Sequence, residues 1–190
     1  VGGLRDGRVN IGGKPFEMAR HGFARRSEFA VSAQGGDFVE FELRESAETL
    51  ARYPLPFSLK VRHQLLEDGF STRFTVANTG TVPMPFCIGG HTAFRCPLEA
   101  GERFEDYRLV FDQAEDAVSI PPGAGGCLQS GVAGIPLDHT DTIALDHGVF
   151  DRVDTLIYQG LRSKTVSLRH KDTGRGVRVD FSEFPMVAFW

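Results

Sequence analysis

Two histidines lie in unusual local sequence and could carry acid–base chemistry. His91 follows the pair Gly89–Gly90, and the missing side chains would let a ligand approach the imidazole closely. His21 lies in the run Arg20–Arg25, directly before a further glycine, Gly22. An imidazole ordinarily titrates near neutral pH, so two rings in such settings indicate proton transfer on a small polar substrate.

The other four histidines lack this setting. His63 falls on the apolar side of an expected strand, and His170 precedes a turn, so we interpret both as structural. His139 and His147 lie in acidic segments that we expect to be loops. A metal site built from these two is conceivable, but no paired spacing supports it. We therefore expect no metal, and proton transfer between a histidine and a carboxylate needs no other cofactor.

Apolar and polar residues alternate with period two through much of the chain, which predicts strands. The clearest runs are 57–65 and 70–77, which form a predicted hairpin around the turn at 67–69. Only 45–53 reads as a helix, and Pro54 limits it to one or two turns. The pattern predicts an all-β protein with antiparallel strands. Further strands are expected at 39–43, 166–170 and 177–181.

Composition narrows the class of protein. The chain has 190 residues, a net charge of -4 and no basic block, so we expect no nucleic-acid partner. It has neither a signal-peptide pattern nor an apolar run near the roughly 20 residues of a membrane span, so we expect no membrane partner. The Gly- and Pro-rich segment 120–136 reads as a loop inside one domain spanning 1–190. The three scattered cysteines, Cys87, Cys96 and Cys127, predict reduced thiols in a cytoplasmic protein.

The runs around His21 and His91 resemble the aldose 1-epimerase (galactose mutarotase-like) family, in particular the branch similar to LacX proteins. Residues 89–98 read Gly-Gly-His-Thr-Ala-Phe-Arg-Cys-Pro-Leu, where that branch looks like Gly-Gly-His-Pro-Ala-Phe-Asn-Cys-Pro-Leu. The run His-Gly-Phe-Ala-Arg at 21–25 matches the branch around its first histidine. Residues 1–8 and 148–157 are also typical, so the resemblance extends over essentially the whole chain.

This resemblance implies an antiparallel β-supersandwich and an isomerase that interconverts the α and β anomers of an aldose. In the family, the histidine matching His91 protonates the ring oxygen as the ring opens, and the histidine matching His21 helps to hold that oxygen. An arginine and an aspartate bind sugar hydroxyls, and Arg5 and Asp154 are the candidates here. The implied partner is a small-molecule sugar, either a hexose or a hexose phosphate. The sequence gives no indication of the oligomeric state.

The catalytic base of the family is a glutamate that follows a segment matching Pro185–Trp190. The resemblance therefore implies a glutamate beyond Trp190 and further strands before Val1, so that the domain is truncated at both ends. A chain without that base is expected to be inactive by itself. Glu183 is the nearest carboxylate, but it precedes the segment and reads as a polar residue at a strand end.

Two other functions were weighed against the epimerase. A non-catalytic carbohydrate-binding or regulatory protein of the same fold would keep the sugar groove without the chemistry, and the glutamate is what distinguishes it. A metal-dependent cupin-like enzyme is also rich in strands. That class requires two histidines one residue apart and a glutamate a few residues later, and the sequence contains no such group.

Overall fold

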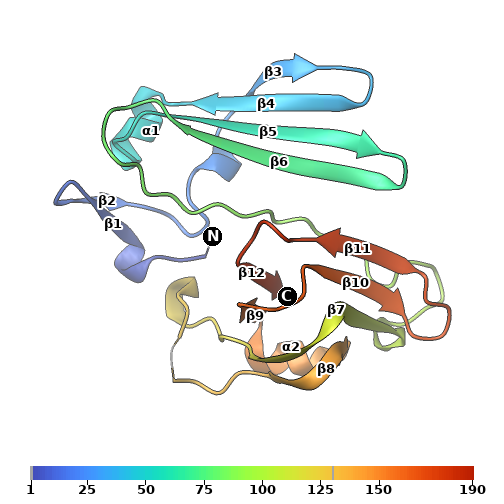
Figure 1. Ribbon diagram of the computed structural model, residues 1–190. Coiled ribbons are helices and arrows are strands. Elements are labelled where there is room, and N and C mark those ends of the chain that lie inside the picture. The colour runs from blue at the N-terminus through green and yellow to red at the C-terminus, as the bar shows by residue number, and fades with distance from the viewer. Residues whose placement is uncertain (1, 130) are drawn as a thin grey trace. The chain divides into compact units, whose positions relative to one another are not determined.

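Strands are the main regular structure of the computed structural model, which describes residues 2–129 and 131–190 (Figure 1). They account for 44% of the chain against 13% for helices of all kinds, so the predicted all-β class is confirmed. Contacts between residues divide the chain into two compact units, Val1–Ile88 and Gly89–Trp190, and each is described by itself. The assignment of 1–190 to one domain stays a prediction.

The first unit is built on a four-stranded antiparallel sheet in the order β3-β4-β5-β6. Strands β5 (Phe57–Leu66) and β6 (Gly69–Asn78) form the predicted hairpin, with Val61 opposite Phe74. On the polar face, Lys60 pairs with Glu40 at 3.2 Å. The sheet is completed by β3 (Ala30–Gln34) and β4 (Phe38–Arg44).

A separate hairpin, β1 (Arg8–Ile11) and β2 (Lys14–Glu17), precedes this sheet. Its two-residue loop is Gly12–Gly13, with φ values of 58° and 78°. Two successive positive φ values are typical of a type I′ turn, which favours glycine at both positions. Short 3₁₀ helices flank the hairpin, namely η1 (Arg5–Gly7) and η2 (Ala24–Arg26).

The predicted helix is confirmed as α1 (Ala47–Arg52). Ser46 caps it, because the Thr49 N–H donates to the Ser46 hydroxyl and the Thr49 hydroxyl accepts from the Ser46 N–H. The helix leads into the small core of the first unit, which centres on four buried side chains and is joined by Phe23 at 6.1 Å from the Tyr53 ring. The buried members are Leu43, Tyr53, Leu55 and Phe57.

The second unit contains a four-stranded antiparallel sheet in the order β11-β10-β7-β8 and a two-stranded sheet, β9 with β12. Two further 3₁₀ helices, η3 (Phe104–Asp106) and η4 (Ala124–Gly126), lie in its loops. Its core is larger and includes Tyr107, Phe111, Leu156 and Tyr158. The strands are β7 (Tyr107–Val118), β8 (Pro136–Ala144), β9 (Leu156–Gln159), β10 (Thr165–His170), β11 (Gly176–Asp180) and β12 (Met186–Phe189).

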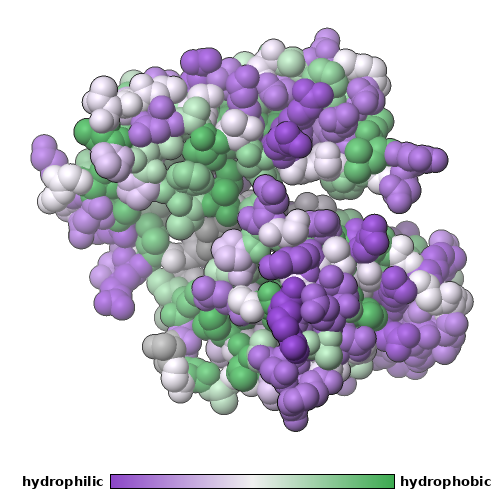
Figure 2. Space-filling model, in the orientation of Figure 1, coloured by the Kyte–Doolittle hydropathy of each residue, from purple (hydrophilic) through white to green (hydrophobic). Residues whose placement is uncertain are grey.

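Hydrophilic side chains cover most of the visible surface over β10 and β11 (Figure 2). Along β11, Val177 and Val179 are half-buried while Arg178 and Asp180 are exposed. This alternation is the one predicted from the sequence for 177–181. Within the part of the chain that the structure describes, no helix is long and apolar enough to cross a membrane.

The structure differs from the sequence-based expectations at two places. A second helix, α2 (His147–Val153), begins after Asp146, whose carboxylate accepts the Gly148 N–H at 2.6 Å. The segment around His147 was expected to be a loop. The segment around His139 was also expected to be a loop, but His139 lies within strand β8. The described part of 120–136 is free of strands up to β8, as predicted, and Ser130 lies outside the described residues.

Candidate functional site

His21 is held by hydrogen bonds to the backbone of Gly2. The His21 N–H donates to the Gly2 carbonyl oxygen at 2.8 Å, and the Gly2 N–H donates to His21 Nδ1 at 3.4 Å. An Nδ1 that accepts leaves the proton of the neutral ring on Nε2. That nitrogen could then donate a hydrogen bond to a ligand oxygen, as the family resemblance requires of His21.

Arg5 lies near Gly2, the residue that contacts His21. It begins the 3₁₀ helix η1, and its exposed guanidinium makes no ion pair or hydrogen bond with a described residue. It lies three positions after Gly2, which contacts His21 directly, and three residues span at most about 11 Å. Two of the four candidate residues, Arg5 and His21, thus lie in the first unit.

His91 rests against the last aromatic side chain of the sequence. Its exposed ring lies 4.4 Å from the Trp190 ring, measured between centroids, with the two planes at 60°. Such an edge-to-face arrangement suits the aromatic quadrupole. The contact joins the predicted acid to the segment after which the resemblance expects the base.

Asp154 lies at a tight turn that follows α2. Its φ of 59° and ψ of -53° place it in a sparsely populated region, and the Thr155 N–H bonds to the carbonyl of Val153 across it. This is a γ-turn with positive φ, which is rare and strained. The Thr155 hydroxyl donates to the exposed Asp154 carboxylate at 3.2 Å. Strain of this kind costs about 1–3 kcal/mol and is common at ligand-binding positions.

The pairing of β9 with β12 brings Asp154 toward Trp190. Phe189, the last residue of β12, lies opposite Leu156, the first residue of β9. Trp190 comes one position later and Asp154 two positions earlier, so both lie at the same end of this strand pair. Paired strands lie about 4.8 Å apart, which keeps these two backbones within about 10 Å. In the second unit, His91 therefore contacts Trp190, and the Asp154 backbone lies near the same end of the β9–β12 strand pair.

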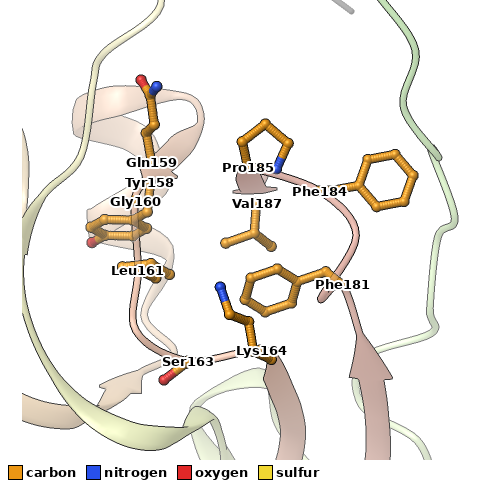
Figure 3. A pocket seen from close by; sticks show the side chains of 10 residues that line it. All are labelled: Tyr158, Gln159, Gly160, Leu161, Ser163, Lys164, Phe181, Phe184, Pro185 and Val187. Carbon is orange, nitrogen blue, oxygen red and sulfur yellow. The ribbon is translucent and has the colours of Figure 1, made fainter.

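A cavity of about 140 Å³ also lies in the second unit, between the paired strands β9 and β12 and the chain after β11 (Figure 3). Apolar side chains such as Phe181 and Val187 line much of it, and the Lys164 amine points into it. Burial raises the pKa of Tyr158 to about 12, so this phenol stays protonated. The lining contains no imidazole and no carboxylate, so the cavity has no pair of groups suited to acid–base work on a sugar.

His139 belongs to an exposed ionic cluster. Its Nδ1 lies 2.8 Å from Asp116 and 2.9 Å from Asp138, and the hydrogen bond that the imidazole donates to Asp138, followed by the Asp116 charge, raises the pKa of the imidazole. Arg162 also pairs with Asp116 at 3.4 Å. His147 has different neighbours, since it stacks on Phe104 with centroids 4.5 Å apart. The two histidines weighed as metal ligands therefore have separate surroundings.

Comparison with known proteins gives this geometry a family context. The model of the family described as aldose 1-epimerase matches residues 8–185. The chain belongs to the aldose 1-epimerase family. The family named from the two histidine runs is thereby confirmed, and the β-sandwich expected with it is consistent with the fold.

Several members of the aldose 1-epimerase family are similar to this chain. Protein LacX (plasmid) of Lactococcus lactis subsp. lactis is 37% identical over 176 residues, which cover 91% of this chain and 58% of that relative. A galactose mutarotase related enzyme from Lactobacillus acidophilus has a TM-score of 0.91 at 30% identity, covering 100% of this chain and 63% of the other. A galactose mutarotase-like protein from Lactobacillus casei ATCC 334 follows at 0.82 and 26%, covering 100% and 65%. The chain thus spans less than two thirds of these relatives.

Sequence reasoning did not identify Trp190 as a neighbour of His91. Trp190 was used only to mark the segment after which the glutamate is expected, although it is the single tryptophan of the sequence. One signal for its position was present: Phe189, the residue before it, is the last residue of strand β12, which pairs with β9. Nothing in the local sequence, however, pairs position 190 with position 91.

Proposed function

We propose that this protein is an aldose 1-epimerase that interconverts the α and β anomers of a hexose or hexose phosphate. The observation that supports it most is the contact of the His91 ring with Trp190, near the end of the β9–β12 strand pair that Asp154 precedes. An imidazole can transfer a proton to a bound sugar, and a carboxylate can accept hydrogen bonds from its hydroxyls. Membership of the family adds independent support.

The proposed reaction opens and recloses the sugar ring. A base removes the proton from the anomeric hydroxyl, the bond between the anomeric carbon and the ring oxygen breaks, and the ring oxygen takes a proton from His91. The resulting aldehyde rotates about its bond to the next carbon. The reverse proton transfers close the ring on the other face and restore both groups, so no proton or electron is consumed.

The other candidates hold the sugar in this proposal. His21 donates Nε2–H to the ring oxygen, which stabilises the negative charge that develops there as the bond breaks. The Asp154 carboxylate accepts hydrogen bonds from sugar hydroxyls, and the Arg5 guanidinium donates them. Each of these contacts orients the ring so that both proton transfers are within reach.

For the base, we propose a glutamate that follows Trp190 in the gene product. His91 contacts Trp190, so a residue that follows it closely in sequence could reach a ligand held at the imidazole. The chain that ends at Trp190 is then expected to speed anomer equilibration very little. If that chain were instead fully active, Glu183 would be the first residue to replace.

We further infer that the protein acts in the cytoplasm. All three cysteines are free thiols, and Cys87 is exposed. An exposed free thiol persists more readily in a reducing compartment than in an oxidising one.

The decisive experiment is polarimetry on the protein as its gene encodes it, with freshly dissolved α-D-galactose, α-D-glucose and glucose 6-phosphate. Acid–base groups commonly contribute about 10²–10⁴-fold to a rate, so we expect His91→Ala to lose that much catalysis. His21→Ala should lose less of the catalytic rate, because in this proposal His21 holds the ring oxygen and does not supply the proton.

His63→Ala is the matched control, since His63 is an exposed histidine bonded to Thr72 at 2.9 Å in the β5–β6 hairpin. It should keep the wild-type rate. If the wild-type gene product bound a sugar but left the mutarotation rate at the uncatalysed background, the epimerase proposal would be wrong. The non-catalytic carbohydrate-binding protein would then be the better description.

A further inference from the structure

His91 lies in a long segment of the chain that has no regular structure. Between strand β6 and helix η3, the structure describes every residue of 79–103, and none of them belongs to a helix or a strand. Segments of this length without secondary structure are uncommon in compact domains and are often functional. An imidazole in such a segment can meet a substrate atom in a fixed geometry only if other contacts hold the backbone that carries it.

One buried hydroxyl holds the later part of this segment. Cys96 and Leu98 pack against the core of the second unit. The Leu98 N–H donates to the hydroxyl of Tyr107 at 3.0 Å. Tyr107 begins strand β7 and has only 1% of its surface exposed. A backbone N–H that no strand or helix satisfies is thus bonded to a side chain of the sheet, seven positions after His91.

The carboxylate of Glu102 fixes the direction of this hydroxyl. Tyr107 donates its O–H to Glu102, so the phenol oxygen presents a lone pair to the Leu98 N–H. The same Glu102 oxygen accepts the Glu99 N–H at 3.1 Å. Burial, followed by the hydrogen bond to Glu102, raises the pKa of Tyr107, so the phenol remains a donor at neutral pH.

Strand β10 and the turn after it hold the Glu102 carboxylate. Arg175 donates to the second carboxylate oxygen, Oε1, at 2.7 Å. His170 Nδ1 accepts two backbone N–H groups of the turn, which leaves the ring proton on Nε2, 3.9 Å from the same oxygen. The hydrogen bond from Tyr107 is the largest cause that lowers the pKa of Glu102, and the Arg175 charge adds to it. The carboxylate is therefore ionised and oriented at neutral pH.

We propose that Tyr107 is a positioning residue that, together with Glu102, holds the segment carrying His91 in place for proton transfer to the ring oxygen of the sugar. Neither residue touches the sugar. The segment is held at two points, since the His91 ring rests on the Trp190 ring at 4.4 Å and the Leu98 N–H bonds to Tyr107. Losing the second hold lets the imidazole shift, and a displacement of about 1 Å can cost about 100-fold in rate. This inference rests on the proposed function, because it explains how the acid of that reaction is placed.

Tyr107→Phe removes the hydroxyl and keeps the ring in the core. The Leu98 N–H then loses its acceptor, so this amide should exchange with solvent about 5- to 50-fold faster. The kcat for mutarotation of α-D-galactose should fall about 10- to 100-fold. KM should stay within about 3-fold of wild type, because Arg5 and Asp154, which bind sugar hydroxyls in the proposed reaction, make no bond to this hydroxyl.

Both quantities are measured on the protein as its gene encodes it. Polarimetry over a range of galactose concentrations separates kcat from KM. Hydrogen exchange followed by mass spectrometry reports on the peptide that contains Leu98 and needs no catalytic activity. Glu102→Gln is a milder variant, because the amide oxygen still accepts from Tyr107 but lacks the charge that pairs with Arg175. We expect it to lower kcat about 3- to 10-fold.

Tyr158→Phe is the matched control. Tyr158 is a fully buried tyrosine of the same core, and its hydroxyl donates to the Ile135 carbonyl at 3.2 Å, a hydrogen bond that does not involve the segment carrying His91. Its loss should lower the free energy of unfolding about as much as Tyr107→Phe does. It should leave both kcat and the exchange of the Leu98 amide at their wild-type values.

The outcomes separate this inference from the function on which it rests. If the wild-type protein is active and Tyr107→Phe loses no more kcat than Tyr158→Phe, positioning is wrong while the proposed function stands. A loss confined to KM, or unchanged exchange at Leu98, also overturns positioning. If Tyr107→Phe does not fold, a wild-type kcat in Glu102→Gln has the same meaning. If the wild-type protein leaves mutarotation at the uncatalysed background, the proposed function and the positioning role fail together.

Discussion

At the scale of single residues, backbone strain coincides with the candidate site. Among the described residues other than glycine, four have positive φ, and they include His21 and Asp154. A third, Asp6, directly follows Arg5, and the fourth is His139 in the exposed ionic cluster. Such conformations cost free energy and are common at functional sites, so those at His21 and Asp154 support the roles proposed for the two residues.

Replacing Asp154 should separate strain from function. Glycine tolerates a φ of 59° whereas alanine does not, so we expect Asp154→Gly to be more stable than Asp154→Ala by about 1–2 kcal/mol. Both variants lack the carboxylate and should lose sugar affinity to a similar degree. Urea unfolding and saturation-transfer NMR measure the two effects. Equal stability of the two variants would show that the turn is not strained.

At the scale of elements, short segments are stabilised by their ends and their neighbours. Helix α1 has only six residues, a length that is marginal for an isolated helix. The reciprocal bonds between Ser46 and Thr49 satisfy two backbone N–H groups that would otherwise lack partners. Its packing matters beyond the helix, because Tyr53 directly after it joins the core that also holds Phe23, two residues from His21.

Removing the cap should weaken the first unit. Ser46→Ala deletes the acceptor for the Thr49 N–H, and a lost cap commonly costs about 0.5–2 kcal/mol. The urea midpoint should therefore fall. Ser32→Ala serves as the control, since Ser32 is an exposed serine in β3 whose hydroxyl bonds to Glu40 at 2.9 Å on the sheet surface. A loss from Ser32→Ala as large as that from Ser46→Ala would contradict the capping argument.

At the scale of the whole molecule, carboxylates held in their ionised form link stability to acid pH. Glu115 is the most buried of them, with 2% of its surface exposed. Burial opposes its ionisation, but hydrogen bonds from Ser163 and Arg162 outweigh that effect and lower its pKa below the usual 4.5. Others with lowered pKa are Glu40, Glu42, Glu102, Asp106, Asp112 and Asp180.

These shifts predict how stability changes with pH. A carboxylate whose pKa is lower in the folded protein stabilises it fully above the unfolded value, near 3.8 for Asp and 4.5 for Glu, and that stability is lost as the pH falls below it. We expect the free energy of unfolding to be nearly constant from pH 7 to 5 and to fall steeply toward pH 3. Urea unfolding across that range measures it, and a flat profile would contradict the assignment.

Glu115→Gln isolates the buried group. It should destabilise the protein at pH 7 by about 1–3 kcal/mol, because an amide cannot accept both N–H groups as the carboxylate does. It should also reduce the loss of stability between pH 5 and 3. Glu67→Gln, in the exposed turn between β5 and β6, should change neither quantity.

The amino-acid sequence alone determined the fold class, most of the clear strands and the family. The hairpin at β5 and β6 is predictable because alternation is a property of neighbouring residues, and the helix at α1 because Pro54 and the polar residues before it are local signals. Helix α2 was not predicted, because its seven residues are too few to show the hydrophobic period of a helix. Packing of Phe150 against Phe104, with centroids 6.2 Å apart, helps to stabilise it instead.

Only the tertiary structure decided which candidates share surroundings. The register of β9 with β12 joins residues 30 or so positions apart, and the contact of His91 with Trp190 joins residues about 100 apart. Such pairings are selected by the burial of Phe189, Leu156 and the core around them, which no local pattern encodes. Sequence thus named the chemical groups, and long-range packing brought the imidazole of His91 to the indole of Trp190 at one end of the β9–β12 strand pair.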